Sequence, residues 1–306
     1  MRVFVTGASG FIGSRVTAEL IGEGYEVLGL ARSDASADAL AAAGADVHRG
    51  SVEDPESLRR GVAKADAVIH LAFNHDALMR DFSKLQENCE VDRCAIEAMG
   101  RELEGSDRPL VVTSGIGALV SGRAATEIDA HGTSAQFPRN ASEEAVDAVV
   151  ARGVRATVIR LPQVHDPLRA GLISWLIGFA KEKGVSAYAG DGTNRWPAVH
   201  VQNAAHLYRL ALEKNAKPGT RYHAVAEEGV QLREIAEAVS RRIGVPVKSM
   251  TPQEAADHFG PFARIAMADL PASSALTREW LGWNPKGPGL ISDVDRIREV
   301  AEVLQR

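Results

Sequence analysis

The sequence predicts an α/β protein with a doubly wound parallel sheet, followed by a smaller and mostly helical C-terminal lobe. Up to Leu161, short apolar runs alternate with helical segments, which is typical of a parallel sheet with right-handed crossovers. A glycine-rich turn joins the first strand to the first helix. The pattern becomes irregular after Pro162. We therefore expect a sheet domain over residues 1–165 and a second lobe over residues 166–306. Part of residues 195–225 is expected to return to the sheet domain and belong to it.

The elements of the sheet domain follow from these patterns. The expected strands are short apolar runs at residues 3–6, 27–31, 67–72, 110–113 and 156–161. The expected helices lie between them, at residues 12–22, 36–43, 56–63, 76–103 and 142–152. Pro55 after Asp54 marks a helix start, and Gly44 marks a helix end. Residues 121–139 are rich in small residues and have no clear period, which predicts a long loop.

In the second lobe we expect a tight turn at residues 190–193, a short strand at 199–201 and a helix that Asn203 caps and that runs to Leu212. The other expected helices are residues 172–183, 232–243, 252–259, 273–281 and 292–304.

Composition excludes several classes of protein. The net charge is −5, from 35 basic and 40 acidic residues, and no Lys/Arg-rich run indicates a nucleic-acid partner. Cys89 and Cys94 are placed on different sides of one expected helix, so neither a disulfide framework nor a metal site is expected. No apolar stretch is long enough for a membrane span, and the chain opens directly on a strand without a signal-peptide pattern. We therefore expect a cytoplasmic protein with reduced thiols.

The glycine-rich turn is suited to a dinucleotide. Gly7 allows a tight turn out of the strand, Gly10 lets the backbone approach a phosphate, and Gly13 lets the helix pack close to the sheet. The free N–H groups of Ser9, Phe11 and Ile12 and the helix dipole then favour an anion such as a pyrophosphate.

The run Thr6-Gly7-Ala8-Ser9-Gly10-Phe11-Ile12-Gly13 resembles the Thr-Gly-x-x-Gly-x-x-Gly signature of the extended short-chain dehydrogenase/reductase superfamily, which includes NAD-dependent epimerases and dehydratases. Segments that resemble other motifs of this superfamily follow in the same order, at residues 66–72, 111–114, 160–165, 190–192, 195 and 199–205. The resemblance covers nearly the whole chain. It implies a Rossmann fold, a bound NAD(P) and a substrate cleft between the lobes.

The resemblance also implies where the cofactor is held. Ser51 and Val52 would flank the adenine. The ribose and phosphates would be lined by Leu71, Ala72 and Phe73. Pro162, Val164 and His165 would lie beside the nicotinamide.

The end of the second strand favours NADP. Enzymes that use NAD place an acid there for the ribose 2′-hydroxyl, and residues 27–33 contain no carboxylate. Arg32 supplies a planar cation and Ser33 a hydroxyl, which suit a 2′-phosphate. The alternative is NAD, with Asp34 reaching the ribose and Arg32 solvated.

The standard proton donor of the superfamily is absent. Its members use a Tyr-x-x-x-Lys pair, but no tyrosine occurs between Tyr25 and Tyr188 and no lysine between Lys84 and Lys181. The lysine position falls near Arg139, which keeps its charge too firmly to act as an acid but can hold the ribose. Ser114 takes the place of the family's catalytic serine.

The candidates for a replacement proton donor are Ser114, His131, His165 and Tyr188. For each of them a plain structural role is the alternative. We expect an NADP-dependent oxidoreductase that reduces a small carbonyl or related compound, with a non-standard proton donor. The alternatives are a non-catalytic NADP-binding redox sensor and a nucleotide-sugar epimerase or dehydratase. The resemblance also implies a possible homodimer through the helices at 76–103 and 142–152.

Overall fold

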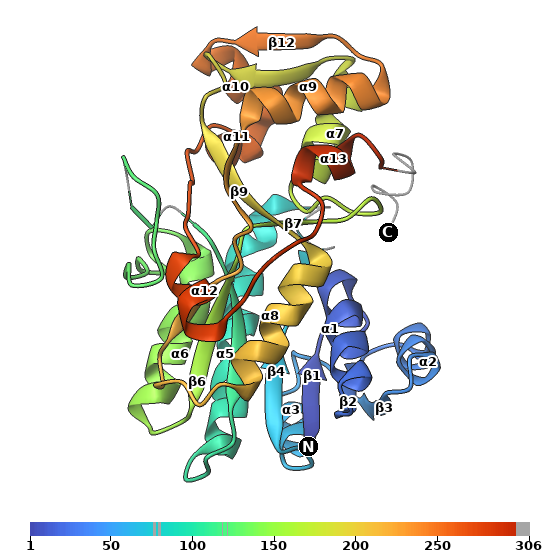
Figure 1. Cartoon of the computed structure of the whole chain (residues 1–306), viewed down its shortest axis with the longest axis vertical. Coiled ribbons are helices and arrows are strands. Elements are labelled where there is room, and N and C mark those ends of the chain that lie inside the picture. The colour runs from blue at the N-terminus through green and yellow to red at the C-terminus, as the bar shows by residue number, and fades with distance from the viewer. Residues whose placement is uncertain (76–77, 79–80, 118, 121, 298–306) are drawn as a thin grey trace.

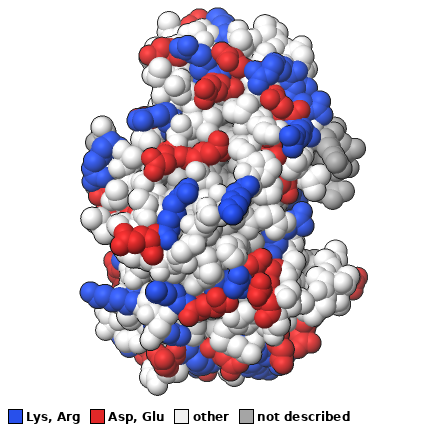
Figure 2. Space-filling view, viewed as in Figure 1, with Lys and Arg blue, Asp and Glu red and all other residues white. Residues whose placement is uncertain are grey.

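The computed structural model describes residues 1–75, 78, 81–117, 119–120 and 122–297, and the chain forms two lobes (Figure 1). The lower lobe in this view contains the N-terminus and a seven-stranded parallel sheet. The upper lobe is smaller and contains helices and two short sheets. On the face shown in Figure 2, Lys and Arg side chains are interspersed with Asp and Glu side chains over both lobes.

The large sheet has the strand order β10-β6-β5-β4-β1-β2-β3, and all of its strand pairs are parallel. Its strands are β1 (Arg2–Thr6), β2 (Glu26–Ala31), β3 (Asp46–Arg49), β4 (Ala67–His70), β5 (Leu110–Gly115), β6 (Ala156–Leu161) and β10 (Arg221–His223). The order reverses between β1 and β4, and ligands of such sheets bind at this reversal, at the carboxyl ends of the strands. This is the predicted fold class.

Helices cover both faces of the large sheet because alternate strand residues point to opposite sides. One face packs on α1 (Phe11–Gly22) and α8 (Val201–Glu213), with Val3 and Val5 in that core. The other face packs on α3 (Pro55–Val62), α5 (Leu85–Leu103) and α6 (Ala141–Ala151). Strand β2 and the edge strand β3 contact α2 (Asp34–Ala42).

The second lobe contains more strands than the sequence predicts. Its helices are α7 (Ile173–Lys183), α9 (Leu232–Ile243), α10 (Pro252–Phe259), α11 (Ala263–Ala266) and α13 (Leu290–Val294). Two small sheets pair β11 (Glu227–Gln231) and β7 (Gln163–His165) with β9 (Arg195–His200), and β12 (Val247–Met250) with β8 (Ser186–Ala189). Most of these strands were missed because they are short and carry polar residues, which hides the alternation.

The capping residue of α8 differs from the prediction. The helix begins at Val201, and the Nδ1 atom of His200 accepts the Gln202 N–H at 3.3 Å. Asn203 binds the C-terminal segment instead: its backbone oxygen accepts the Trp283 indole N–H at 3.0 Å, and its Oδ1 atom accepts the Lys286 N–H at 3.2 Å. This segment follows α12 (Ala275–Leu281), which contacts β10, and continues to α13 on the second lobe (Figure 1).

Two predicted helices differ in their bounds. The range predicted as one helix at 76–103 contains α5, which begins at Leu85 after a 3₁₀ turn (Phe82–Lys84). Asp81 starts that turn by accepting the Ser83 N–H at 2.9 Å, while residues 76–77 and 79–80 lie outside the described chain. The helix predicted at 292–304 is α13, and its predicted end also lies outside the described residues. Within the described chain, no helix combines the length and apolarity that crossing a bilayer requires.

Candidate cofactor and active site

Two glycines of the turn after β1, Gly7 and Gly13, have no room for a side chain. Gly7 has a φ of 67°, and a Cβ on it would lie 2.8 Å from the backbone nitrogen of Ala72. A Cβ on Gly13 would lie 1.9 Å from the Gly7 carbonyl oxygen. Gly10 gives α1 no side-chain cap, and the first turn of α1 contains no acid. The Gly10 N–H donates to the Gly7 carbonyl oxygen at 2.9 Å, which leaves the first N–H groups of α1 to face an anion, and the turn fits a pyrophosphate.

The end of β2 presents an unengaged cation. Arg32 is exposed and has no hydrogen bond or ion pair to any residue that the structure describes. Asp34 instead pairs with Arg49, with 2.5 Å between Oδ1 and Nη2. Ser33 caps α2 by accepting the Ser36 N–H at 3.2 Å. Of the two side chains that could reach a ribose here, the carboxylate is thus already paired.

The other predicted cofactor residues gather at the carboxyl edge of the large sheet. Each follows or ends a strand: Ser51 and Val52 after β3, Leu71, Ala72 and Phe73 after β4, Ser114 in β5, and Pro162 after β6. Val164 and His165 lie in β7, which continues from β6 into the second lobe. Motif residues that are far apart in the sequence therefore lie along one rim of the large sheet, because parallel strands have their carboxyl ends at the same edge.

A buried hydrogen-bonded chain lies below this rim. The Thr6 hydroxyl accepts the N–H groups of Leu71 and Ala72, each at 3.2 Å, so its own hydrogen is left for Nδ1 of His70 at 2.7 Å. The proton of His70 is then on Nε2, which donates to Asp92 Oδ1 at 3.0 Å. This chain connects the glycine-turn strand β1 to helix α5.

Asp92 connects the chain to Arg139. Asp92 Oδ2 accepts the Arg139 Nη1–H at 2.7 Å and the Ser142 hydroxyl at 2.5 Å. Burial alone would raise the pKa of Asp92, but the Arg139 charge and the hydrogen bonds from His70 and Ser142 outweigh it and hold this pKa well below its usual range. Asp92 is therefore an ionised carboxylate inside the protein, neutralised by one arginine.

Arg139 lies at the carboxyl ends of β4 and β5. Its Nη2 donates to the backbone oxygen of Thr113 at 3.1 Å, and its guanidinium carbon lies 4.2 Å from the centre of the Phe73 ring. Ser114 is the next residue of β5 and is 4% exposed, yet its hydroxyl has no hydrogen-bond partner in the described part of the chain. That Arg139 takes the position of the family's lysine stays a prediction.

The structure does not bring His131 into this network. Nδ1 of His131 contacts the Gly132 backbone oxygen at 2.7 Å, and Nε2 contacts Asp147 Oδ2 at 2.9 Å. Asp147 lies in α6 and also accepts Arg221 of the edge strand β10 at 2.5 Å. His131 therefore belongs to an ion-paired group at the β10 edge of the sheet.

His165 is held by the C-terminal segment. Its ring is completely buried, and Nδ1 lies 2.7 Å from Asp293 Oδ2 of α13. Burial lowers the pKa of His165 below its ordinary value despite this hydrogen bond. Tyr188, the remaining candidate, lies in β8, where the Arg233 guanidinium is 5.7 Å from its ring centre. Both contacts are with the second lobe.

The sequence analysis missed Asp92 and His70. A usable signal was present for Asp92, because it shares the apolar side of α5 with Cys89 and Ile96 at spacings of three and four residues. An acid on the buried side of a helix requires a partner. Its partner Arg139 lies 47 residues further along the chain, which no local pattern shows.

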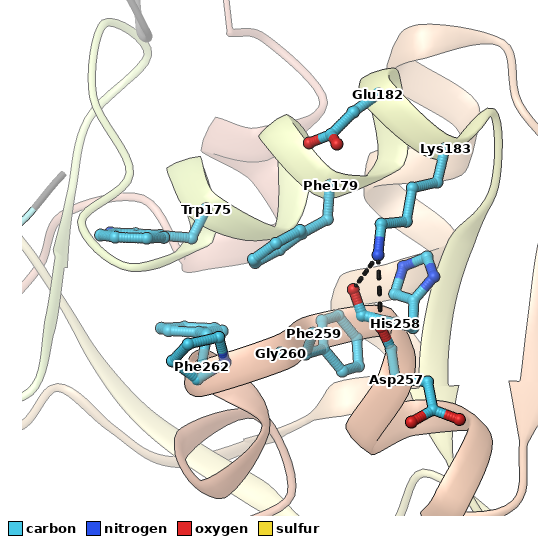
Figure 3. A pocket seen from close by; sticks show the side chains of 10 residues that line it. Trp175, Phe179, Glu182, Lys183, Asp257, His258, Phe259, Gly260 and Phe262 are labelled. Atoms are coloured by element: carbon cyan, nitrogen blue, oxygen red, sulfur yellow. Dashed lines mark hydrogen bonds between the residues drawn. The ribbon is translucent and has the colours of Figure 1, made fainter. Parts of the chain in front are cut away.

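An apolar pocket of about 260 Å³ lies away from this rim, in the second lobe (Figure 3). Trp175 and Phe179 project from α7 toward Phe262 and Phe259, and the parallel rings of Trp175 and Phe262 have centres 5.5 Å apart. Lys183 closes one end by donating to the His258 backbone oxygen at 2.5 Å. In the described chain, no group of His, Cys, Asp and Glu side chains is arranged to hold a metal ion.

Comparison with known proteins defines the class. The family pattern described as the NAD dependent epimerase/dehydratase family matches residues 3–224, and the chain belongs to this family. The family predicted from the glycine turn is thereby confirmed.

Individual proteins are similar over most of the chain. An uncharacterized protein of Schizosaccharomyces pombe is 45% identical over 96% of this chain and 98% of its own length. A 2-alkyl-3-oxoalkanoate reductase of Stenotrophomonas maltophilia is 27% identical over 80% of this chain and 77% of its own. The crystal structure of UDP-glucose 4-epimerase from Thermotoga maritima superposes with a TM-score of 0.73 at 21% identity, over 97% of this chain and 99% of that one. The last similarity shows the fold alone.

Proposed function

We propose that the protein is an NADP-dependent oxidoreductase that reduces a small carbonyl compound. The observation that carries this proposal is the hydroxyl of Ser114, which lacks a hydrogen-bond partner among the described residues and lies at the carboxyl end of β5. Ser114 Oγ is not among the fully buried side-chain atoms that lack a partner, so this hydroxyl reaches the surface at the rim and is open to a hydrogen bond with a ligand. A substrate carbonyl above the nicotinamide is such a ligand.

The residues present fit the cofactor. The glycine turn holds the pyrophosphate, and Arg32 with Ser33 receives the 2′-phosphate. Ser51 and Val52 flank the adenine, and Phe73 and Arg139 lie at the nicotinamide ribose. When bound, NADPH supplies the hydride, so the protein has to orient the carbonyl, polarise it and exclude water.

Two alternatives stay open. The absence of any tyrosine between Tyr25 and Tyr188 favours a redox sensor that binds NADP without turnover. Family membership favours a nucleotide-sugar epimerase or dehydratase, but those reactions begin with a tyrosine-assisted oxidation. The similarity to a 3-oxoalkanoate reductase supports a ketone as substrate instead.

The test is turnover with NADPH. The purified protein is mixed with NADPH and a panel of aldehydes, ketones, 3-oxoalkanoates and nucleotide sugars, and the absorbance of NADPH is followed. We expect oxidation with at least one ketone. We also expect Ser114→Ala to lower kcat by about 10²-fold, because it removes a donor to the reacting oxygen. Tight NADPH binding without turnover of any compound would favour the sensor, and interconversion of sugars without net NADPH loss would favour the epimerase.

A further inference from the structure

The guanidinium of Arg139 is fixed at the carboxyl ends of β4 and β5, and the family resemblance aligns this residue with the lysine of the missing pair. We propose that Arg139 is a catalytic residue, which together with Ser114 stabilises the negative charge that develops on the carbonyl oxygen of the substrate. This proposal rests on the proposed reductase function and deepens it. It replaces proton donation by electrostatic stabilisation.

The first step of the argument is the anchoring of Arg139. Nη1 is committed to Asp92 and Ser142, and one Nη2–H is committed to the Thr113 backbone oxygen. A guanidinium carries more N–H groups than these contacts use. The Nε–H and the second Nη2–H have no partner among the residues that the structure describes. Arg139 is therefore held firmly and still has donors for a ligand.

The second step places Ser114 on the same side as Arg139. The hydroxyl of Thr113 contacts the Tyr208 hydroxyl of α8 at 2.7 Å, so Thr113 faces the α1/α8 side of the sheet. Successive strand residues point to opposite faces, and Ser114 therefore faces the α5/α6 side. Asp92 and Ser142, the anchors of Arg139, lie in α5 and α6. The unpartnered hydroxyl and the anchored cation thus share one side of the end of β5.

The third step is electrostatic. The Arg139 side chain is 15% exposed and that of Asp92 is 2% exposed, so both charges are largely removed from water. Interactions in such surroundings are much stronger than in solvent, and fixed donors need no reorganisation when charge develops. Asp92 is a positioning residue here, because it aims Arg139 and does not reach the rim itself. His70 and Thr6 fix Asp92 in turn.

The chemical step balances without a protein acid. The carbonyl carbon gains a hydride from the reduced nicotinamide, which is oxidised. The π bond between carbon and oxygen breaks, and its electron pair moves to the oxygen. That oxygen is held by hydrogen bonds from Ser114 and Arg139 and then takes a proton from water. An arginine stays charged over the working pH range, so the rate of this step should not depend on a titrating donor.

The first test measures binding and needs no turnover. Hexanoate is titrated calorimetrically into the protein saturated with NADP⁺, because its carboxylate mimics the oxyanion. We expect Arg139→Ala to weaken hexanoate binding at least tenfold and Arg264→Ala, an exposed arginine without a partner among the described residues, to leave it unchanged. Equal hexanoate affinity in wild type and Arg139→Ala would overturn the inference. If NADP⁺ itself does not bind to the wild type, the proposed function fails instead.

The second test uses chemical rescue. Arg139→Ala should lose about 10²–10³-fold in kcat, as expected for an oxyanion donor, and added guanidinium should restore part of the loss. Guanidinium should not rescue Ser114→Ala. Arg139→Lys should retain NADP⁺ binding and serve as the variant for comparison if Arg139→Ala does not fold. Failure of guanidinium to rescue a folded Arg139→Ala, or a wild-type kcat that falls steadily with rising pH as an acid is lost, would contradict the inference.

Discussion

At the scale of single residues, the side chains on which the structure depends most are the buried charged ones that have a partner. Asp92, Glu143 and Asp293 are each at most 4% exposed. Glu143 binds Arg160 through both oxygens at 2.8 Å, and Asp293 contacts His165. A buried charge that loses its partner costs far more than a surface charge does. These residues are therefore the places where substitutions should have the largest effects.

Substitution of Asp92 should be strongly destabilising. Asp92→Ala leaves the charge of Arg139 without its buried counter-ion, and we expect a loss of about 3–5 kcal/mol in the free energy of unfolding, measured by urea denaturation. Asp38→Ala, which removes an exposed carboxylate, should change it by less than about 0.5 kcal/mol. Similar losses in both variants would show that the buried ion pair is not a stabilising feature.

His165 should make stability depend on pH. Its pKa in the folded protein is lowered by burial, against opposing effects of Asp293 and Asp166, and the nearby His200 lowers it further. Such a group stabilises the fold above its ordinary pKa of about 6.5, and this contribution is lost as the pH falls. Glu227, whose carboxylate oxygen lies 3.9 Å from Nε2 of His165, has the opposite effect on stability. Burial raises the pKa of Glu227, so its contribution to the stability of the fold grows as the pH falls.

The variant His165→Gln tests this dependence. The free energy of unfolding of the wild type should fall between about pH 7.5 and pH 5.5, and that of His165→Gln should fall less over the same range. Chemical denaturation at several pH values measures both. An identical slope for the two proteins would mean that other histidines, such as the buried His223, account for the whole dependence.

At the scale of elements, the glycine turn shows how sequence and structure agree. The spacing of Gly7, Gly10 and Gly13 predicts a turn that packs a helix tightly against a strand, and the structure has a Gly13 Cα with no room for a Cβ. Gly22, at the other end of α1, has open space around it. The two glycines of one helix thus provide a matched pair.

Gly13→Ala should abolish tight cofactor binding and destabilise the protein by about 1–3 kcal/mol, because its methyl group would meet the Gly7 carbonyl oxygen. Gly22→Ala should leave binding unchanged and stabilise the helix by about 0.5–1 kcal/mol. Thermal unfolding and NADPH titration of both variants check this. Normal NADPH affinity in Gly13→Ala would contradict the assigned role of the turn.

The sequence predicts elements well where local chemistry decides them. The apolar strands β1, β2 and β6 and the capped helix α3 lie within two residues of their expected positions. The strand β3 was missed because Asp46, His48 and Arg49 interrupt its apolar pattern. In the site, motif residues were predicted, but the partners of Arg139 and His165 were not, since they lie 47 and 128 residues away in the chain.

At the scale of the whole molecule, the two lobes are joined by chain segments that cross more than once. The sheet continues through β6 into β7 of the second lobe, and the chain returns to the large sheet with α8 and β10. The segment from α12 to α13 crosses again, anchored by Trp283 on Asn203 and by Asp293 on His165 (Figure 1). Because these anchors lie beside β7, the C-terminal segment should set how the second lobe faces the cofactor rim.

A homodimer through α5 and α6 stays a prediction. The outer side of α5 carries an ion-paired ladder in which Arg93 binds Glu90 and Glu97. If this side of α5 is buried in a dimer, each of these charges has to keep a partner, because burying an unpaired charge is costly. Size-exclusion chromatography with light scattering should give twice the monomer mass of 32.7 kDa, and a monomer at all concentrations would refute the dimer.

The most direct test of the whole account is a calorimetric titration of NADPH and NADH into the wild type and Arg32→Ala. We predict that NADPH binds the wild type more tightly than NADH does, and that Arg32→Ala weakens NADPH binding by about tenfold or more while NADH binding changes little, since only NADPH carries the 2′-phosphate. Equal effects on the two cofactors would contradict the assignment of NADP, and the absence of heat with either one would contradict the cofactor site itself.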